Sequence, residues 1–143
     1  MKLSRLIEPY KENGKTNLGF CNGKAGVYLI YRDGKLRYVG YSGYNLYKTL
    51  TRHFQEWDSK KNFKTGITYV RDLKWYHFQV RVCICSPARA EKLEKALIVK
   101  YQPKDNVDKL KGHEITPAEQ KAYRDFNNAP ALTKKELEEE VPF

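Results

Sequence analysis

One stretch of the sequence, GVYLIYRDGKLRYVG at residues 26–40, limits the possible folds more than any other. Two short apolar runs flank Asp33 and Gly34, and this dipeptide strongly favours the tight turn of a β-hairpin. The runs are rich in β-branched and aromatic residues, as strands are. We therefore expect two antiparallel strands, at 25–32 and 36–41.

The rest of the chain predicts helices and one further strand. Apolar residues recur at helical spacing after Asn45, and Ser86-Pro87 has the residue types of a helix N-cap and first turn. Thr116 and Glu119 are spaced as a capping box. The expected elements are helices at 45–57, 87–101, 116–128 and 133–140 and a strand at 74–85. This order predicts an α+β fold, in which a small three-stranded antiparallel sheet is flanked by helices.

Length and composition fit one compact domain with extensions. The chain has 143 residues, which is enough for a modest core. We place the domain at 24–110, between a polar N-terminal extension at 1–23 and a helical extension with an acidic tail at 111–143. The N-terminus lacks the apolar core of a secretion signal, and no apolar run is long enough to span a bilayer. We expect a cytoplasmic protein without membrane contact.

The charge distribution points to a polyanionic partner. The net charge is +10, and the last 33 residues contain five Lys or Arg and seven Asp or Glu. The first 110 residues therefore carry a net charge of +12. A basic body of this kind suits nucleic acid, although many basic proteins have no such partner. Tyrosines, of which the chain has eleven, can stack on bases or bond to phosphates.

The three cysteines, Cys21, Cys83 and Cys85, do not form a disulfide framework. Cys83 and Cys85 are two residues apart in the expected strand, so their side chains share a face and a bridge between them would be strained. Buried reduced thiols are the simplest interpretation. The alternative is a metal site made by Cys83, Cys85 and His77, for which no second pair of ligands is present.

Four blocks of residues resemble the GIY-YIG nuclease family. Gly26-Val27-Tyr28 is followed about ten residues later by Tyr38-Val39-Gly40, which resembles the two-part signature of the family. The stretch YVGYSGYNLYKTLTRHF, at 38–54, resembles the family's second strand and first helix. The stretch AEKLEKALIVKYQPKDN, at 90–106, resembles a later helix. The resemblance covers residues 24–110, and the blocks occur in the family's order.

The resemblance implies hydrolysis of DNA phosphodiester bonds with one divalent cation, Mg²⁺ or Mn²⁺. Glu94 matches the family's metal-binding carboxylate, and a hard oxygen ligand suits either ion. Tyr28 would be the general base for the attacking water, assisted or replaced by Tyr38. A free phenol has a pKa of about 10, so it acts as a base only where cations favour the phenolate. We expect the basic first helix, with Lys48, Arg52 and His53, to supply them, and we count Arg52 and His53 among the catalytic candidates.

This first helix lacks an arginine that the family usually carries one turn before the position of His53. Thr49 occupies that place. Arg52 lies three residues further on a neighbouring part of the helical face, and we expect it to reach the scissile phosphate. Lys48 is the second candidate. If the arginine is lost altogether, the chain binds nucleic acid without cutting it.

Structural roles are the alternative for Tyr28, Tyr38 and Glu94, because strand tyrosines often only pack and helical glutamates are often solvated. A plain two-residue turn would pair Tyr28 with Val39 and place the two tyrosines on opposite faces of the sheet. A shared site therefore requires a β-bulge or an odd-length loop in this hairpin.

Further residues are candidates for substrate binding. Ser42 and Asn106 match positions of the family pattern, and Lys48 and Lys74 are expected to hold phosphates without sequence choice. The Lys-rich loop DSKKNFKTG, at 58–66, has the same expected role or is simply solvated. No separate DNA-reading module is apparent. Formation of a homodimer is one way in which such a small chain would contact a longer stretch of DNA.

The C-terminal residues LEEEVPF resemble the acidic tip of bacterial single-stranded-DNA-binding proteins. That tip docks into an apolar pocket on replication and repair proteins, so the resemblance implies such a partner for Glu138–Phe143. A frayed tail and a tail that covers the basic active face in cis are the alternatives. Three functions are therefore open: a nuclease, an inactive nucleic-acid-binding module, and an adaptor that recruits a replication or repair protein.

Overall fold

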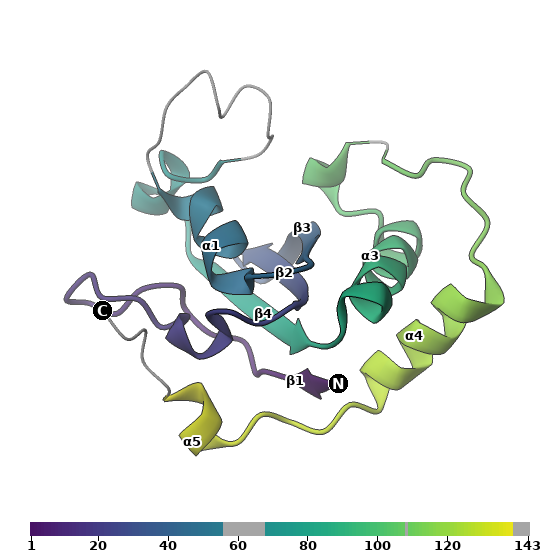
Figure 1. Cartoon of the computed structure of the whole chain (residues 1–143). Helices are drawn as coiled ribbons and strands as arrows, with labels where there is room; N and C mark the ends of the chain where they lie inside the picture. The colour runs from purple at the N-terminus through teal and green to yellow at the C-terminus, as the bar shows by residue number, and fades with distance from the viewer. Residues whose placement is uncertain (56–67, 108, 139–143) are drawn as a thin grey trace.

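The computed structural model describes residues 1–55, 68–107 and 109–138 of the chain (Figure 1). Its centre is an antiparallel sheet of four strands in the order β1-β4-β2-β3. The strands are β1 (Lys2–Leu3), β2 (Gly26–Arg32), β3 (Lys35–Ser42) and β4 (Phe78–Ile84). The fold is α+β, as predicted, but the sheet has four strands rather than three because β1 pairs with β4. A strand of two residues is too short to show an alternating pattern in the sequence.

The hairpin of β2 and β3 contains the bulge that a shared tyrosine site requires. Asp33 and Gly34 form its two-residue turn with positive φ angles of 50° and 80°. The pairing shifts by one residue close to this turn, so Tyr28 pairs with Gly40 rather than with the residue before it. Tyr28 and Tyr38 consequently lie on one face, where their ring centroids are 6.1 Å apart. The prediction of an irregular hairpin is confirmed.

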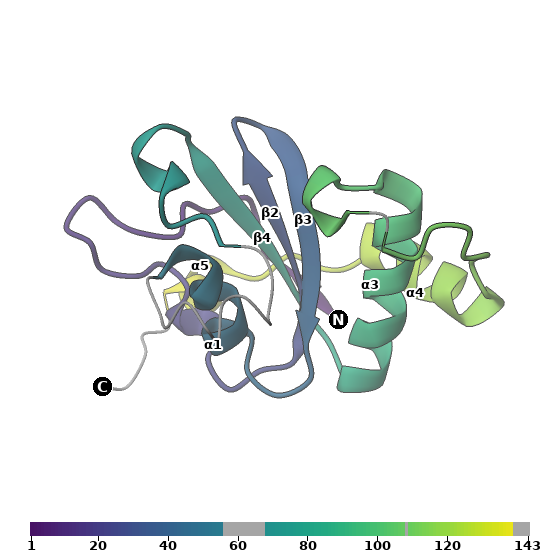
Figure 2. The same ribbon diagram turned by 90° about the horizontal axis from the view of Figure 1, so that it is seen from above.

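Helices cover both faces of the sheet (Figures 1 and 2). Their bounds are Leu46–Thr51 for α1, Arg52–Phe54 for the 3-10 helix η2 that continues it, and Pro87–Tyr101 for α3. Tyr28 and Ile30 belong to the core under α1, whereas Val27 and Leu29 belong to the core under α3. Since the side chains of β2 alternate between the two cores, this strand is apolar on both sides.

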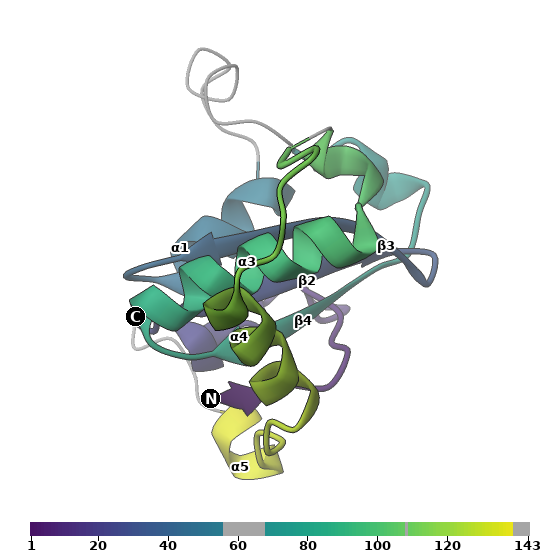
Figure 3. The same cartoon turned by 90° about the vertical axis from the view of Figure 1, so that its right-hand side faces the viewer.

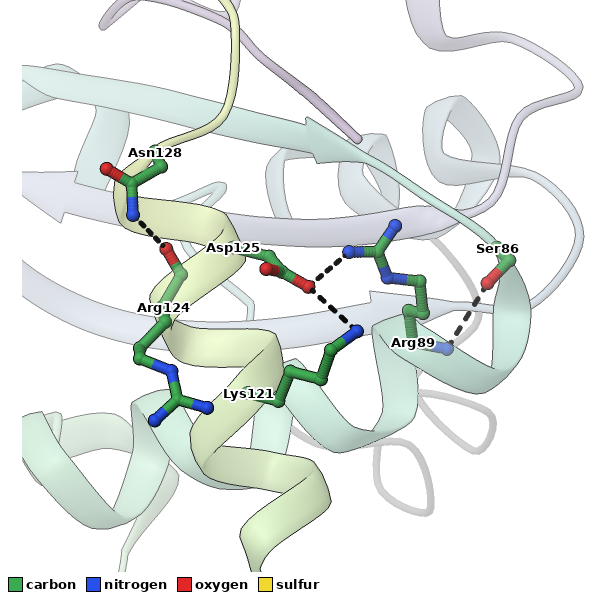
Figure 4. A network of polar contacts seen from close by, with 6 residues as sticks. All are labelled: Ser86, Arg89, Lys121, Arg124, Asp125 and Asn128. Carbon is green, nitrogen blue, oxygen red and sulfur yellow. Dashed lines mark hydrogen bonds and ion pairs between the residues drawn. The ribbon is translucent and has the colours of Figure 1, made fainter.

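Helix α4 (Pro117–Asn127) lies against the outer side of α3 (Figure 3). Arg89 Nη2 on α3 is 2.6 Å from Asp125 Oδ2 on α4, and this ion pair joins the two helices (Figure 4). Both helices begin at their predicted N-caps, Ser86 and Thr116. Side-chain capping and apolar spacing were therefore sufficient to locate them.

Both ends of the described chain contribute to the cores. Ile7 and Leu18, which precede β2, and Leu132, which follows α4, are buried in the core under α1. Leu132 N donates to Leu3 O at 2.9 Å, so the segment after α4 lies beside β1. The short helix α5 (Lys134–Leu137) comes next, at the predicted position. Loops without periodicity thus bury apolar side chains in segments that the sequence predicts to be polar extensions.

Two elements differ from their predicted bounds. The helix predicted at 45–57 becomes a 3-10 helix at Arg52, and Trp57 and the Lys-rich loop at 58–66 lie outside the described residues. The strand predicted from residue 74 begins at Phe78, because Asp72–Lys74 forms the 3-10 helix η3. Among the described residues, no helix combines the length and the apolar content that a bilayer crossing requires.

Candidate active site

Tyr28 lies over the backbone of the edge strand β3. It pairs with Gly40, and a Cβ added to Gly40 would overlap the phenol group of Tyr28. Gly26, at the start of β2, is constrained in the same way, because a Cβ there would overlap the carbonyl oxygen of Cys83 on β4. Gly26 therefore allows two strands to pair closely, and Gly40 leaves room for the ring of the candidate base.

His53 binds the hydroxyl group of Tyr28. Tyr28 Oη is 2.8 Å from His53 Nε2, and the histidine comes from η2 at the end of α1. The ring centroid of Tyr38 is 4.9 Å from that of His53. Tyr28 and His53 are 2% and 7% exposed, so both side chains are largely buried. The structure thus brings three of the predicted catalytic residues together.

Glu94 lies on α3, where its side chain is only 7% exposed, and its charge acts on Tyr28 and Tyr38. Lys109 Nζ is 3.4 Å from Glu94 Oε1, and the lysine side chain is 48% exposed. Burial raises the pKa of the Glu94 carboxyl, and the ammonium of Lys109 acts in the opposite direction. Lys95 also acts on this carboxyl, and a buried carboxylate with partly exposed cationic neighbours is a suitable ligand for a metal ion.

Both tyrosines are protonated at neutral pH in this arrangement. Burial raises the pKa of Tyr28 well above its usual value of 10.0, and Tyr38 and the charge of Glu94 raise it further. Burial and the charge of Glu94 also raise the pKa of Tyr38. We expect the basic first helix to favour the phenolate, but among the described residues the pKa values of both tyrosines shift upward. The same effects show that Glu94 lies within electrostatic range of both phenols.

Tyr69 is a member of the cluster that the sequence does not reveal. Its ring centroid is 6.2 Å from that of His53, and its backbone N donates to His53 O. Its hydroxyl donates to Asp105 Oδ2 at 2.7 Å, while Arg37 Nη2 donates to Asp105 Oδ1 at 2.8 Å. No local motif surrounds Tyr69, because its place depends on partners from β3, η2 and the segment after α3.

Two predicted substrate-binding residues have structural partners. Asn106 Oδ1 accepts from Val39 N and Asn106 Nδ2 donates to Val39 O, both at 2.9 Å. Asn106 therefore forms hydrogen bonds with the backbone N–H and C=O groups of the edge strand instead of facing substrate. Ser42 is buried, and its Oγ accepts from Asn45 N at 3.0 Å, which shapes the turn into α1.

The predicted cationic contacts are on the surface. Lys48 on α1, Arg52 in η2 and Lys74 in η3 are all exposed. Arg52 directly precedes His53, so it is the nearest of the three to the cluster along the chain. Exposure of this kind suits phosphate contacts.

The alternative metal site at the cysteines is not formed. All three cysteines are free and buried, in agreement with the simplest interpretation. His77 is exposed, and its Nε2 is 3.0 Å from Glu8 Oε1. Within the described ranges, no group of three or more His, Cys, Asp or Glu side chains is arranged to hold a metal ion. Glu94 is then the candidate ligand, since one carboxylate completed by water and phosphate oxygens needs no such group.

Comparison with known proteins identifies no relative. No family model matches the chain, and neither a curated protein nor a solved structure is significantly similar to it. The resemblance to GIY-YIG nucleases therefore depends on the residues of the chain itself.

Proposed function

We propose that the chain is a metal-dependent endonuclease of GIY-YIG type that hydrolyses DNA phosphodiester bonds. The observation that carries this proposal is the buried pair of Tyr28 Oη and His53 Nε2, 2.8 Å apart, beside Tyr38 and within electrostatic range of Glu94. A pair that accepts a proton, within electrostatic range of a buried carboxylate, is typical of the active site of a hydrolase. The net charge of +12 on the first 110 residues supports a polyanionic substrate.

Tyr28 and His53 act together as the proposed base. A phenol with a raised pKa is a poor base on its own. When neutral His53 carries its proton on Nδ1, its Nε2 accepts the phenol proton. The attacking water then loses a proton to the Tyr28 oxygen while Tyr28 passes its own proton to His53. This coupling explains how a tyrosine buried among apolar groups serves at neutral pH.

Glu94 is the proposed ligand of one divalent cation, Mg²⁺ or Mn²⁺. Its carboxylate is a hard oxygen donor, and the ammonium of Lys109 at 3.4 Å demonstrates that a positive charge is accommodated beside it. Because Lys109 is half-exposed, its ammonium can move into solvent. When bound, the ion would polarise the phosphate and stabilise the leaving oxygen.

The exposed cations are proposed to hold the DNA backbone. Arg52 is placed next to His53 and takes the role that Thr49 cannot fill. Lys48 and Lys74 add phosphate contacts that do not depend on sequence. Arg52→Ala should abolish cleavage while the variant still folds. An active Arg52→Ala variant would remove this assignment.

Nicking of a supercoiled plasmid tests the proposal. The wild type should nick the plasmid with Mg²⁺ or Mn²⁺, whereas EDTA or the Glu94→Ala substitution should abolish nicking. Lys121→Ala is a matched control, because Lys121 is exposed and pairs with Asp125 on α4. Nicking by Glu94→Ala at the wild-type rate would exclude the proposed metal ligand.

A nucleic-acid-binding module of the same fold that does not cut DNA is the second candidate. Thr49 in place of the usual arginine and the ammonium of Lys109 beside Glu94 favour it. This candidate predicts a salt-sensitive gel shift with plasmid and no nicking with either ion. The acidic tail at Glu138–Phe143 is proposed to recruit a replication or repair protein in either case, and only Glu138 of it lies within the described residues.

A further inference from the structure

Two exposed aromatic side chains lie beside the turn of the β2–β3 hairpin. Trp75 is 79% exposed and Tyr76 is 42% exposed. Such exposure of a tryptophan is unusual, because tryptophan side chains are on average highly buried. We propose that Trp75 and Tyr76 bind an unpaired nucleobase by stacking, and that the basic side chains around them bind the neighbouring phosphates.

Hydrogen bonds hold the aromatic pair in place. Trp75 N and Tyr76 N both donate to Asp72 O at 3.0 Å, which closes the turn of η3. His77 N donates to Asp33 Oδ1 at 2.9 Å, and Asp33 N donates to His77 O at 2.8 Å. These bonds attach the segment before β4 to the hairpin turn, at the top of the view in Figure 2. An ordered backbone lowers the entropy lost when an exposed ring binds a ligand.

The charge around the pair favours a phosphate backbone over other partners. Arg32 Cζ lies 4.3 Å from the centroid of the Tyr76 ring, so a cation is already seated on one aromatic face. The charged residues close to η3 and the hairpin turn are Arg32, Lys35, Arg71, Lys74, Asp33 and Asp72, and Glu8 bonds to His77 beside them. Cations outnumber acids among them, and Asp33 is engaged with His77 N. Aromatic rings interleaved with cations are the usual construction of sites for single-stranded nucleic acid.

A short segment connects this aromatic pair to the candidate active site. Asp72 N and Leu73 N donate to Tyr69 O at 2.9 and 3.2 Å, and the Tyr69 ring lies beside His53. Trp75 follows Tyr69 by six residues, which span at most about 20 Å. The inference rests on the proposed function and adds a substrate class to it: DNA that has an unpaired segment next to the cleaved bond.

Tryptophan emission provides a direct test. The chain contains two tryptophans, so Trp57→Phe leaves Trp75 as the reporter. In a Glu94→Gln background with EDTA, an oligo(dT) of about eight nucleotides should quench the emission of Trp75. An abasic oligomer of the same length, which has the phosphates but no bases, should bind more weakly and leave the emission unchanged. Equal quenching by both oligomers would overturn the stacking proposal.

Substitutions separate stacking from charge. Trp75→Ala should weaken oligo(dT) binding roughly fivefold to one-hundredfold without changing the melting midpoint, and Trp75→Phe should retain most of the affinity. Lys74→Gln should weaken the binding of both oligomers and reduce the slope of log affinity against log salt concentration by about 0.7. Tyr101→Ala is the control, because Tyr101 is a 48% exposed aromatic residue on α3.

Two results would contradict the inference. Trp75→Ala with wild-type affinity for oligo(dT) would exclude the stacking site. Emission of Trp75 that changes with protein concentration in the absence of DNA would show instead that the surface binds a second copy of the chain. Because these measurements need no turnover, they are independent of plasmid nicking, which tests the proposed function separately.

Discussion

Replacing Gly40 with alanine should damage the candidate site in a way that can be calculated from the structure. A Cβ at this position would overlap the phenol group of Tyr28, whose ring is enclosed by Tyr38 and His53. Inserting a methyl group into a packed region costs about 1–3 kcal/mol. For a domain of this size that lowers the melting midpoint by about 3–10 °C. Displacement of the ring also breaks its 2.8 Å hydrogen bond to His53, so cleavage should fall by about one-hundredfold or more.

Gly43→Ala is the matched control for this experiment. A Cβ on Gly43 would meet Pro87 Cβ at 3.9 Å, which is an ordinary van der Waals contact. Calorimetry should therefore give a wild-type midpoint for Gly43→Ala, and plasmid nicking should continue at the wild-type rate. If Gly40→Ala matched this control in both assays, the explanation of the glycine and of the position of Tyr28 would be refuted.

Three further predictions follow from the ion pairs, the buried carboxylate and the tail. Burial raises the pKa of folded Glu94 above its usual 4.5, so the residue stabilises the fold while it is protonated and this contribution is lost as the pH rises through the raised value. Glu94→Gln should thus gain stability relative to the wild type as the pH rises from 4.5 through the raised pKa in urea titrations, and a relative loss would contradict the burial argument. Asp105→Ala leaves Arg37 and the Tyr69 hydroxyl without their shared acceptor and should lower the free energy of unfolding by about 2–3 kcal/mol. An unchanged free energy of unfolding would show that this carboxylate does not stabilise the fold. Deletion of 138–143 should abolish pull-down of a replication or repair protein and leave nicking unchanged, whereas faster nicking would show that the tail covers the active face.

Local patterns were enough to predict most elements that position the site. The dipeptide Asp33-Gly34 located the hairpin turn, and Ser86 and Thr116 located two helix starts, because turns and caps depend on neighbouring residues only. The bulge could be inferred from one requirement, that two tyrosines share a face. The strand β1 could not, because its pairing depends on β4 and not on its own sequence.

Long-range contacts account for what the sequence does not reveal about the site. Tyr69 joins the cluster through Asp105, which lies 36 residues away. Asn106 binds the backbone of Val39, and no local feature distinguishes such an amide from one that faces substrate. The raised pKa of Tyr28 also depends on burial by separate elements, which no local sequence pattern reveals.

The central claim is that Tyr28, His53 and Glu94 act as one hydrolytic unit. Single-turnover nicking with Mg²⁺, measured for Tyr28→Phe, Glu94→Gln and the double variant, tests it most directly. When residues act as a unit, the effects of substituting them on the cleavage rate do not add. The double variant should therefore be no slower than the slower of the two single variants. A double variant whose loss equals the product of the two single losses, or a Tyr28→Phe variant with the wild-type rate, would contradict the account.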